Sequence, residues 1–127
     1  MHTFRFSYRR LDAFHVAKDA LSRGHRIAQK FPRGYGPLAD QLRRALASAY
    51  TQTVEGASRE GADRKQRCRV ARAECNEAAA AVEGAHAIGL ISETEANEVL
   101  VLLDRLAGML TRSAGSAPRL EGVLRTS

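Results

Sequence analysis

Apolar residues recur at intervals of three and four residues in four separate stretches of the chain, and this spacing restricts the fold more than any other feature. The clearest stretch carries Val99, Leu103, Leu106 and Leu110. Side chains at such intervals share one face of an α-helix, whereas a half-buried strand requires strict alternation of apolar and polar residues. No alternating run long enough for a strand occurs in the sequence, which therefore predicts an all-α fold.

Prolines and glycines mark the ends of the first two predicted helices. The first helix is expected to begin at Asp12, a favourable N-cap, and to end before Pro32. Its predicted core residues are Phe14, Ala17, Leu21, Ala28 and Phe31. The second helix is expected to begin with Pro37 and to end at Gly56. Its predicted core residues are Leu38, Leu42, Ala45 and Ala49.

Capping signatures mark the third and fourth helices. The third helix is expected to start at the signature that Asp63 makes with Gln66 and to end at Gly89. Its predicted core residues are Cys68, Ala71, Cys75, Ala78, Ala79, Val82 and His86. Ser92 and Glu95 form a capping box for the fourth helix, whose apolar stripe is widened by Leu102 and Met109.

Four helices joined by short connections predict an antiparallel up-down-up-down four-helix bundle. We expect residues 1–11 to form an N-terminal extension, residues 12–115 the bundle and residues 116–127 a flexible C-terminal tail.

No stretch approaches the roughly 18 consecutive apolar residues of a membrane-spanning helix, and the arginine-rich N terminus is unlike a signal peptide. We therefore expect a soluble, cytoplasmic protein. Cys68 and Cys75 lie about 10 Å apart on one predicted helix and are expected to be reduced, buried thiols.

The net charge of +6 is unevenly distributed along the chain. Residues 59–72 hold six Lys or Arg against two acids, whereas residues 73–111 hold seven acids against Arg105. This asymmetry indicates either a polyanionic partner or a self-complementary assembly. The candidate phosphate-binding residues lie on the first and third predicted helices and are Arg23, Arg26, Lys30, Lys65, Arg69 and Arg72. The alternative is an ordinary solvated surface.

Two further rows of side chains are unusual for a helix surface. Gln41, Ser48, Gln52 and Glu55 form a polar row beside the core stripe of the second helix. Opposite the core stripe of the third helix lies a row of mostly small residues, which comprises Ala73, Glu77, Ala80 and Gly84. Small side chains allow another helix to approach closely, so the small row is a candidate subunit contact. The alternative is that the small row is solvent-exposed and contains alanine only because alanine is a good helix former.

No constellation in the sequence resembles a catalytic or metal centre. The four histidines are scattered, and no pair has the i, i+4 spacing that places two imidazoles on one metal ion. Glu83 with His86 supplies only one of the two Glu-x-x-His motifs of a di-iron bundle. Phosphate-binding loops, dinucleotide-binding loops and a nucleophile elbow are also missing. We therefore expect no enzymatic activity, no metal, no cofactor and no small-molecule substrate.

Several short motifs in a fixed order resemble those of a known family. They run from about Leu11 to Leu110 and comprise Phe31-Pro32, Gln41-Leu42-Arg43-Arg44-Ala45 with Ser48, Glu55-Gly56, Val70-Ala71-Arg72, Glu77 and Ile88-Gly89-Leu90-Ile91. By these motifs the chain is similar to the four-helix-bundle proteins named after the intervening sequences of bacterial 23S ribosomal RNA genes. That family includes the accessory protein of diversity-generating retroelements.

The resemblance implies an antiparallel bundle that assembles as a homo-oligomeric ring, commonly a pentamer with a basic surface. It also implies association with RNA or with an RNA-handling protein such as reverse transcriptase. The chain departs from the family pattern at Gln52, where Asn is usual, at Thr53, where Ile is usual, and at Ala73-Glu74, where Gly-Ser is usual. These departures border the polar row and the small row.

Together these observations predict a non-enzymatic homo-oligomeric bundle that presents basic surface to RNA or to a ribonucleoprotein partner. The alternative is a structural or adaptor protein that binds another protein through the ring, without nucleic acid. A polar network or subunit contact is expected at Gln41, Arg44, Ser48, Gln52, Glu55 and Glu77. Of these residues, at least Gln52 and Glu55 are expected to be substantially buried in the assembled state.

Overall fold

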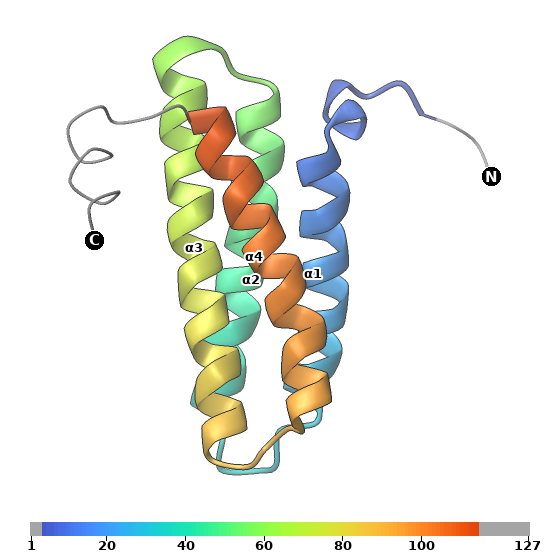
Figure 1. The fold of residues 1–127 in the computed structure, drawn as a ribbon, viewed down its shortest axis with the longest axis vertical. Helices are drawn as coiled ribbons and strands as arrows, with labels where there is room; N and C mark the ends of the chain where they lie inside the picture. The colour runs from blue at the N-terminus through green and yellow to red at the C-terminus, as the bar shows by residue number, and fades with distance from the viewer. Residues whose placement is uncertain (1–3, 115–127) are drawn as a thin grey trace.

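The computed structural model describes residues 4–114, which form four long helices preceded by one short 3-10 turn. The elements are η1 (Ser7–Arg10), α1 (Asp12–Gln29), α2 (Gly36–Ala57), α3 (Gly61–Ala87) and α4 (Glu93–Ala114). Each helix runs lengthwise and opposite in direction to the helix before it (Figure 1). No strand occurs within residues 4–114, so the prediction of an all-α fold with four helices is confirmed. The expected tail, residues 116–127, lies outside the described residues.

The buried residues of each helix follow the seven-residue spacing of a coiled-coil seam. In α3 the buried positions include Ala71, Cys75, Ala78, Val82 and Ala85. In α4 they include Val99, Leu103, Leu106 and Leu110. Alternating steps of three and four keep one stripe facing the bundle axis, which is the packing expected when long helices lie nearly parallel. The core therefore runs the whole length of the four helices.

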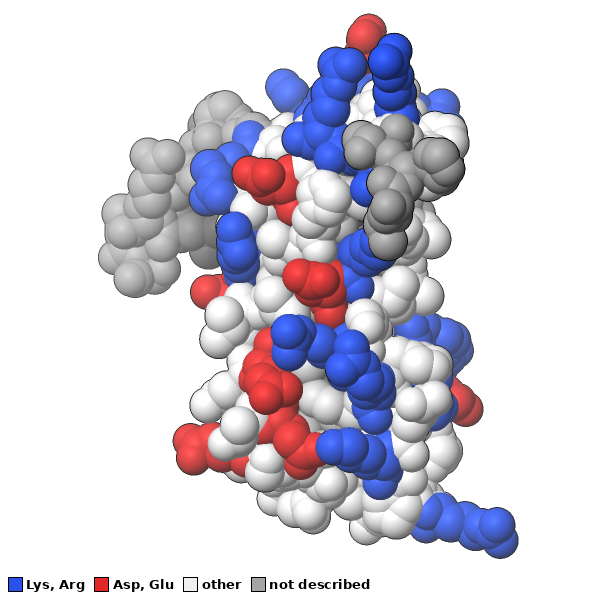
Figure 2. Space-filling model, turned by 90° about the vertical axis from the view of Figure 1, so that its right-hand side faces the viewer, with Lys and Arg blue, Asp and Glu red and all other residues white. Residues whose placement is uncertain are grey.

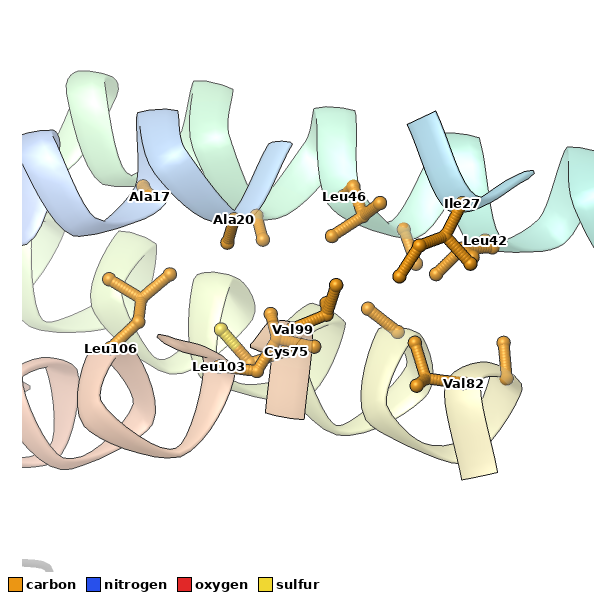
Figure 3. Packing of buried hydrophobic residues seen from close by; sticks show 14 of the residues in the cluster. Ala17, Ala20, Ile27, Leu42, Leu46, Cys75, Val82, Val99, Leu103 and Leu106 are labelled. Atoms are coloured by element: carbon orange, nitrogen blue, oxygen red, sulfur yellow. The ribbon is translucent and has the colours of Figure 1, made fainter. Parts of the chain in front are cut away.

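Large side chains of α2 and α4 fill the space that small side chains of α1 and α3 leave. Figure 3 shows Leu42 and Leu46 of α2 and Leu103 of α4 pointing into the interior that Cys75 lines from α3. Gly24 of α1 lies directly against Leu46, so a Cβ at position 24 would clash with the leucine side chain. Alternation of large and small residues gives dense packing without voids.

Helix α1 begins at Asp12, as predicted, whereas α3 begins at Gly61, two residues before Asp63. The N-cap roles predicted for Asp12 and Asp63 are both wrong. The first backbone hydrogen bonds of α1 and α3 are accepted by the carbonyl oxygens of Leu11 and Glu60. Leu11 and Glu60 are therefore the N-caps, and neither makes a side-chain capping bond. Asp12 becomes the first residue of α1. Asp63 lies in the first turn of α3, where its carboxylate pairs with arginines instead of capping the helix.

Two predicted helix ends also differ from the structure. Gly56 does not end α2 but lies buried inside it, where a Cβ would stand 3.4 Å from Sγ of Cys68. The glycine thus allows close approach of α3. Pro37 occupies the first turn of α2 but follows Gly36, the first helical residue. The predicted end at Gly89 is confirmed, because α3 stops at Ala87 and Gly89 adopts the positive φ of 80° that favours glycine.

Most of the predicted core residues of α3 are buried, and His86 is the exception. Its side chain is exposed, and Ala79 is only partly buried. The seven-residue spacing places Ala85 rather than His86 in the stripe.

Both cysteines are buried and free, as predicted. Burial raises the pKa of the Cys75 thiol to about 12 and also raises that of Cys68. None of the helices within residues 4–114 is long and apolar enough to cross a membrane.

We predict opposite effects on stability for two glycine-to-alanine substitutions. Gly24→Ala forces the buried Leu46 to move, and overpacking of this kind lowers the free energy of unfolding by about 1–3 kcal/mol, partly offset by about 1 kcal/mol of helix propensity. Gly84→Ala meets no atom within 4 Å and gains only the helix propensity. Urea unfolding followed by circular dichroism measures both changes. A Gly24→Ala variant more stable than the parent protein would contradict the packing described above.

Candidate nucleic-acid interface

The candidate cations Arg23 and Arg26 of α1, and Lys30 directly after its end, lie opposite acidic residues of α4. Nζ of Lys30 lies 2.7 Å from Oε2 of Glu95, and Nη1 of Arg23 lies 4.0 Å from Oε2 of Glu98. Arg26 donates a hydrogen bond to the Ser22 hydroxyl one turn earlier. Figure 2 shows acidic and basic side chains side by side over this face. The α1 set therefore does not form an unbroken basic surface.

Glu95 connects the start of α4 to α1. Its Oε1 accepts a hydrogen bond from the backbone N–H of Ser92 at 2.9 Å, while the Ser92 hydroxyl accepts one from the backbone N–H of Glu95. This is the predicted capping box, which is confirmed. The hydrogen bond from Lys30, followed by that from the Ser92 backbone, lowers the pKa of Glu95 from 4.5 to about 2.

The candidate cations of α3 differ from one another in their surroundings. Lys65 and Arg69 are exposed, and neither forms an ion pair with any residue from 4 to 114. Arg72 is half-buried and donates a 3.3 Å hydrogen bond to Oγ1 of Thr111 on α4. Lys65 and Arg69 are thus available to phosphate groups, whereas Arg72 already joins two helices.

One end of the bundle brings together cations from distant parts of the sequence. The η1 turn, the α2–α3 connection and the end of α4 all lie at the upper end in Figure 1. We call this the basic end, and its cations include Arg5, Arg9, Arg10, Arg59, Arg64, Lys65, Arg67 and Arg69. Asp63 pairs with Arg59 and with Arg67, which offsets part of this charge. The contribution of the N-terminal arginines was not predicted, because only the antiparallel order of the helices places residues 5–10 and 59–69 at the same end.

The first residue of the polar row, Gln41, borders a hollow between α2 and α3. Gln41 and Arg44 line this hollow of about 330 Å³ together with Glu74 and Glu77. A hydrogen bond with Glu74 and the charge of that carboxylate raise the pKa of Glu77, and Arg44 opposes the rise. The structure therefore brings Gln41, Arg44 and Glu77 together. Two carboxylates in one place leave this part of the surface acidic.

The other members of the polar row have separate surroundings. Glu55 is partly exposed and pairs with Arg59 of the following connection. Ser48 is half-buried, and its carbonyl accepts a hydrogen bond from Thr51. Oε1 of Gln52 is buried and has no hydrogen-bond partner among the described residues. A buried amide oxygen without a partner is unfavourable.

No group of three His, Cys, Asp or Glu side chains within residues 4–114 is arranged to hold a metal ion.

We predict that Lys30→Gln raises the pKa of Glu95. The substitution removes the ion pair but leaves the Ser92 backbone donor, so the pKa should rise above 2 and remain below 4.5. Because the pKa is lowered in the folded protein, the stabilising contribution of Glu95 is present above its ordinary value and lost as the pH falls towards 2. Carbon NMR of the side-chain carboxyl measures the titration. Arg43→Gln, which touches neither residue, serves as the control, and an unchanged pKa in Lys30→Gln would contradict the assignment.

Comparison with known proteins places the chain within a protein family. The family model described as 23S rRNA-intervening sequence protein matches residues 9–112, which span all four helices almost completely. No curated protein matches the chain. The match extends over most of the sequence and covers the motifs that resemble this family. The protein belongs to the 23S rRNA-intervening sequence protein family.

Proposed function

We propose that the protein is a non-enzymatic, homo-oligomeric RNA-binding bundle. In this proposal the up-down-up-down bundle is the protomer of a ring, with a pentamer favoured, and its basic surface contacts RNA or a ribonucleoprotein partner in the cytoplasm. The observation that carries the proposal is that Lys65 and Arg69 are exposed and form no ion pair with any other residue from 4 to 114. The name of the family refers to a ribosomal RNA gene, which agrees with a polyanionic partner.

We rank the six candidate cations by how readily each could contact a phosphate. Lys65 and Arg69 stand first, since a phosphate contact there costs no existing ion pair among the described residues. Arg23, Arg26 and Lys30 follow, because RNA must compete with Glu95 and Glu98 for two of them. Arg72 contributes charge to the same face while its guanidinium remains bonded to Thr111.

We predict that the double substitution Lys65→Gln and Arg69→Gln weakens RNA binding and its salt dependence. Each phosphate contact contributes about 0.7 to 0.9 to the slope of log K against log salt, so the slope should fall by about one to two. Fluorescence anisotropy with labelled RNA over a series of salt concentrations measures both quantities.

The matched control is the double substitution Arg33→Gln and Arg43→Gln. It removes the same charge near the opposite end of the bundle, since Arg33 lies in the α1–α2 connection. We expect this variant to bind nearly as the parent protein does. Equal weakening in both variants would show a general effect of net charge and contradict the assignment to Lys65 and Arg69.

Three observations support assembly of the bundle with copies of itself. Gln52 has a buried oxygen without a partner among residues 4–114, and Glu77 shares a surface hollow with Glu74 and Arg44. The small row adds the third observation, because Ala73 and Ala80 are exposed and Gly84 faces open space. A neighbouring helix could pack against the small row and supply hydrogen-bond donors to the polar row. Burial of Gln52 and Glu55 in the ring is part of this proposal.

We predict that Ala80→Arg prevents assembly without unfolding the protomer. The new side chain projects from an exposed helical position, so it leaves the core intact and blocks close helix contact. Ala47→Arg makes the same change on an exposed position of α2 and is the control. Light scattering after size exclusion should give a multiple of 13.9 kDa for the parent protein and the control, and a single-chain mass for Ala80→Arg. A single-chain mass for the parent protein would contradict the ring.

One feature favours the alternative function of a structural or adaptor protein. A groove of about 450 Å³ between α1 and α4 is bordered by Val101 and Leu102, and the Val101 side chain is 65% exposed. Another protein could bind this partly apolar groove. Failure of the parent protein to bind RNA at low salt, together with an intact ring, would favour the adaptor function over RNA binding.

A further inference from the structure

Three aromatic rings of the N-terminal segment stack on one another at the basic end. The ring centroids of Phe4 and Phe6 lie 5.9 Å apart, and those of Phe6 and Tyr8 lie 5.6 Å apart. The interplanar angles are 28° and 9°, so the rings are nearly parallel. Phe4 and Phe6 are nevertheless 55% and 56% exposed. Exposed apolar side chains held in a defined arrangement often mark a binding surface.

Contacts with the bundle hold this stack in place. Tyr8 packs edge-on against Phe14 with a centroid distance of 4.8 Å, and Phe14 in turn lies 5.9 Å from Tyr50 of α2. His15 also forms a 2.9 Å hydrogen bond with the carbonyl oxygen of Arg9. Phe14 is fully buried, so the stack extends outward from the core. The core thus fixes Tyr8, and Tyr8 orients the two exposed phenylalanines.

Arginines alternate with these rings. Arg5 lies between the two phenylalanines, and Arg9 and Arg10 follow Tyr8. Arg5 forms no ion pair with the other described residues. Exposed parallel rings beside positive charge match the chemistry of single-stranded nucleic acid, in which bases stack on aromatic side chains and phosphates pair with cations. Bases within a duplex already stack on one another and cannot use such a surface.

We propose that the aromatic stack is a platform for unpaired bases of RNA, in which a base stacks on Phe4 at the end of the stack, Phe6 holds the Phe4 ring in place, and Arg5, Arg9 and Arg10 contact the adjoining phosphates. This inference rests on the proposed function and specifies the kind of RNA as single-stranded segments. The platform binds unpaired bases. Lys65 and Arg69, at the same end of the bundle, attract the phosphates of single-stranded and double-stranded RNA alike.

The test compares the full-length protein with its Phe4→Ala, Phe6→Ala double variant. The probes are a uridine-rich single strand of about ten nucleotides, near the usual site size, and an RNA duplex of similar length. Loss of a stacked ring weakens single-strand binding by roughly 5- to 150-fold. We therefore expect at least about tenfold weaker binding of the single strand and little change for the duplex. Ultraviolet crosslinking of the bound single strand should modify Phe4.

Two further variants separate stacking from other roles of the phenylalanines. Ile88→Ala with Tyr35→Ala removes side chains that are 55% and 41% exposed in the connections at the opposite end of the bundle and should leave binding unchanged. Phe4→Leu with Phe6→Leu keeps apolar surface but loses the rings, so it should weaken single-strand binding as alanine does. Full binding by the leucine variant would overturn the platform. So would loss of binding to phosphatidylglycerol vesicles in the alanine variant with unchanged RNA binding, which would assign the phenylalanines to a lipid surface.

The outcomes distinguish this inference from the proposed function. If the parent protein binds both probes through Lys65 and Arg69 but the alanine variant binds the single strand equally well, the platform is wrong and RNA binding stands. If the parent protein binds neither probe at low salt, both proposals fail.

Discussion

Close approach of α3 to its two neighbours is the constraint on which the rest of the structure depends. The inward face of α3 consists largely of alanine and cysteine, and each buries little apolar area. The stabilisation must come from dense contact with the leucines of α2 and α4 rather than from bulky side chains of α3 itself. Gly56 brings α2 nearer to Cys68, and Gly24 makes room for Leu46. Dense contact of this kind fixes the register of the helices, which in turn decides which polar side chains meet.

Features that depend on a few neighbouring residues could be predicted from the sequence. The four helices, most of their core residues, the Ser92–Glu95 capping box and the glycine at position 89 all follow from spacing or from local backbone geometry. The errors arose where backbone hydrogen bonding began a residue or more before the expected side-chain cap. A helical stripe of loose spacing admits His86 to the core, whereas supercoiled packing uses the stricter seven-residue spacing and leaves His86 exposed.

The candidate site was less predictable, because its electrostatics depend on tertiary contacts. Lys30 and Lys65 look alike in the sequence, yet one faces Glu95 across the α1–α4 contact and the other faces solvent. The bond from Arg72 to Thr111 likewise depends on the register of α3 against α4. Exposed ion pairs are weak and screened by salt. A polyanion that binds the α1 cations more strongly than the carboxylates of α4 do could therefore displace these carboxylates. Sequence patterns identify the cations but not their partners.

The two ends of the bundle are closed differently. At the end opposite the basic end, the Gly89 turn, the capping box and the Lys30–Glu95 bond tie α1, α3 and α4 together. At the basic end, the start of α1 and the end of α4 border a hollow of about 360 Å³ that includes Leu11 and Met109. A ligand bound at the basic end would contact both the start of α1 and the end of α4, so part of its binding energy would appear as increased order of the bundle.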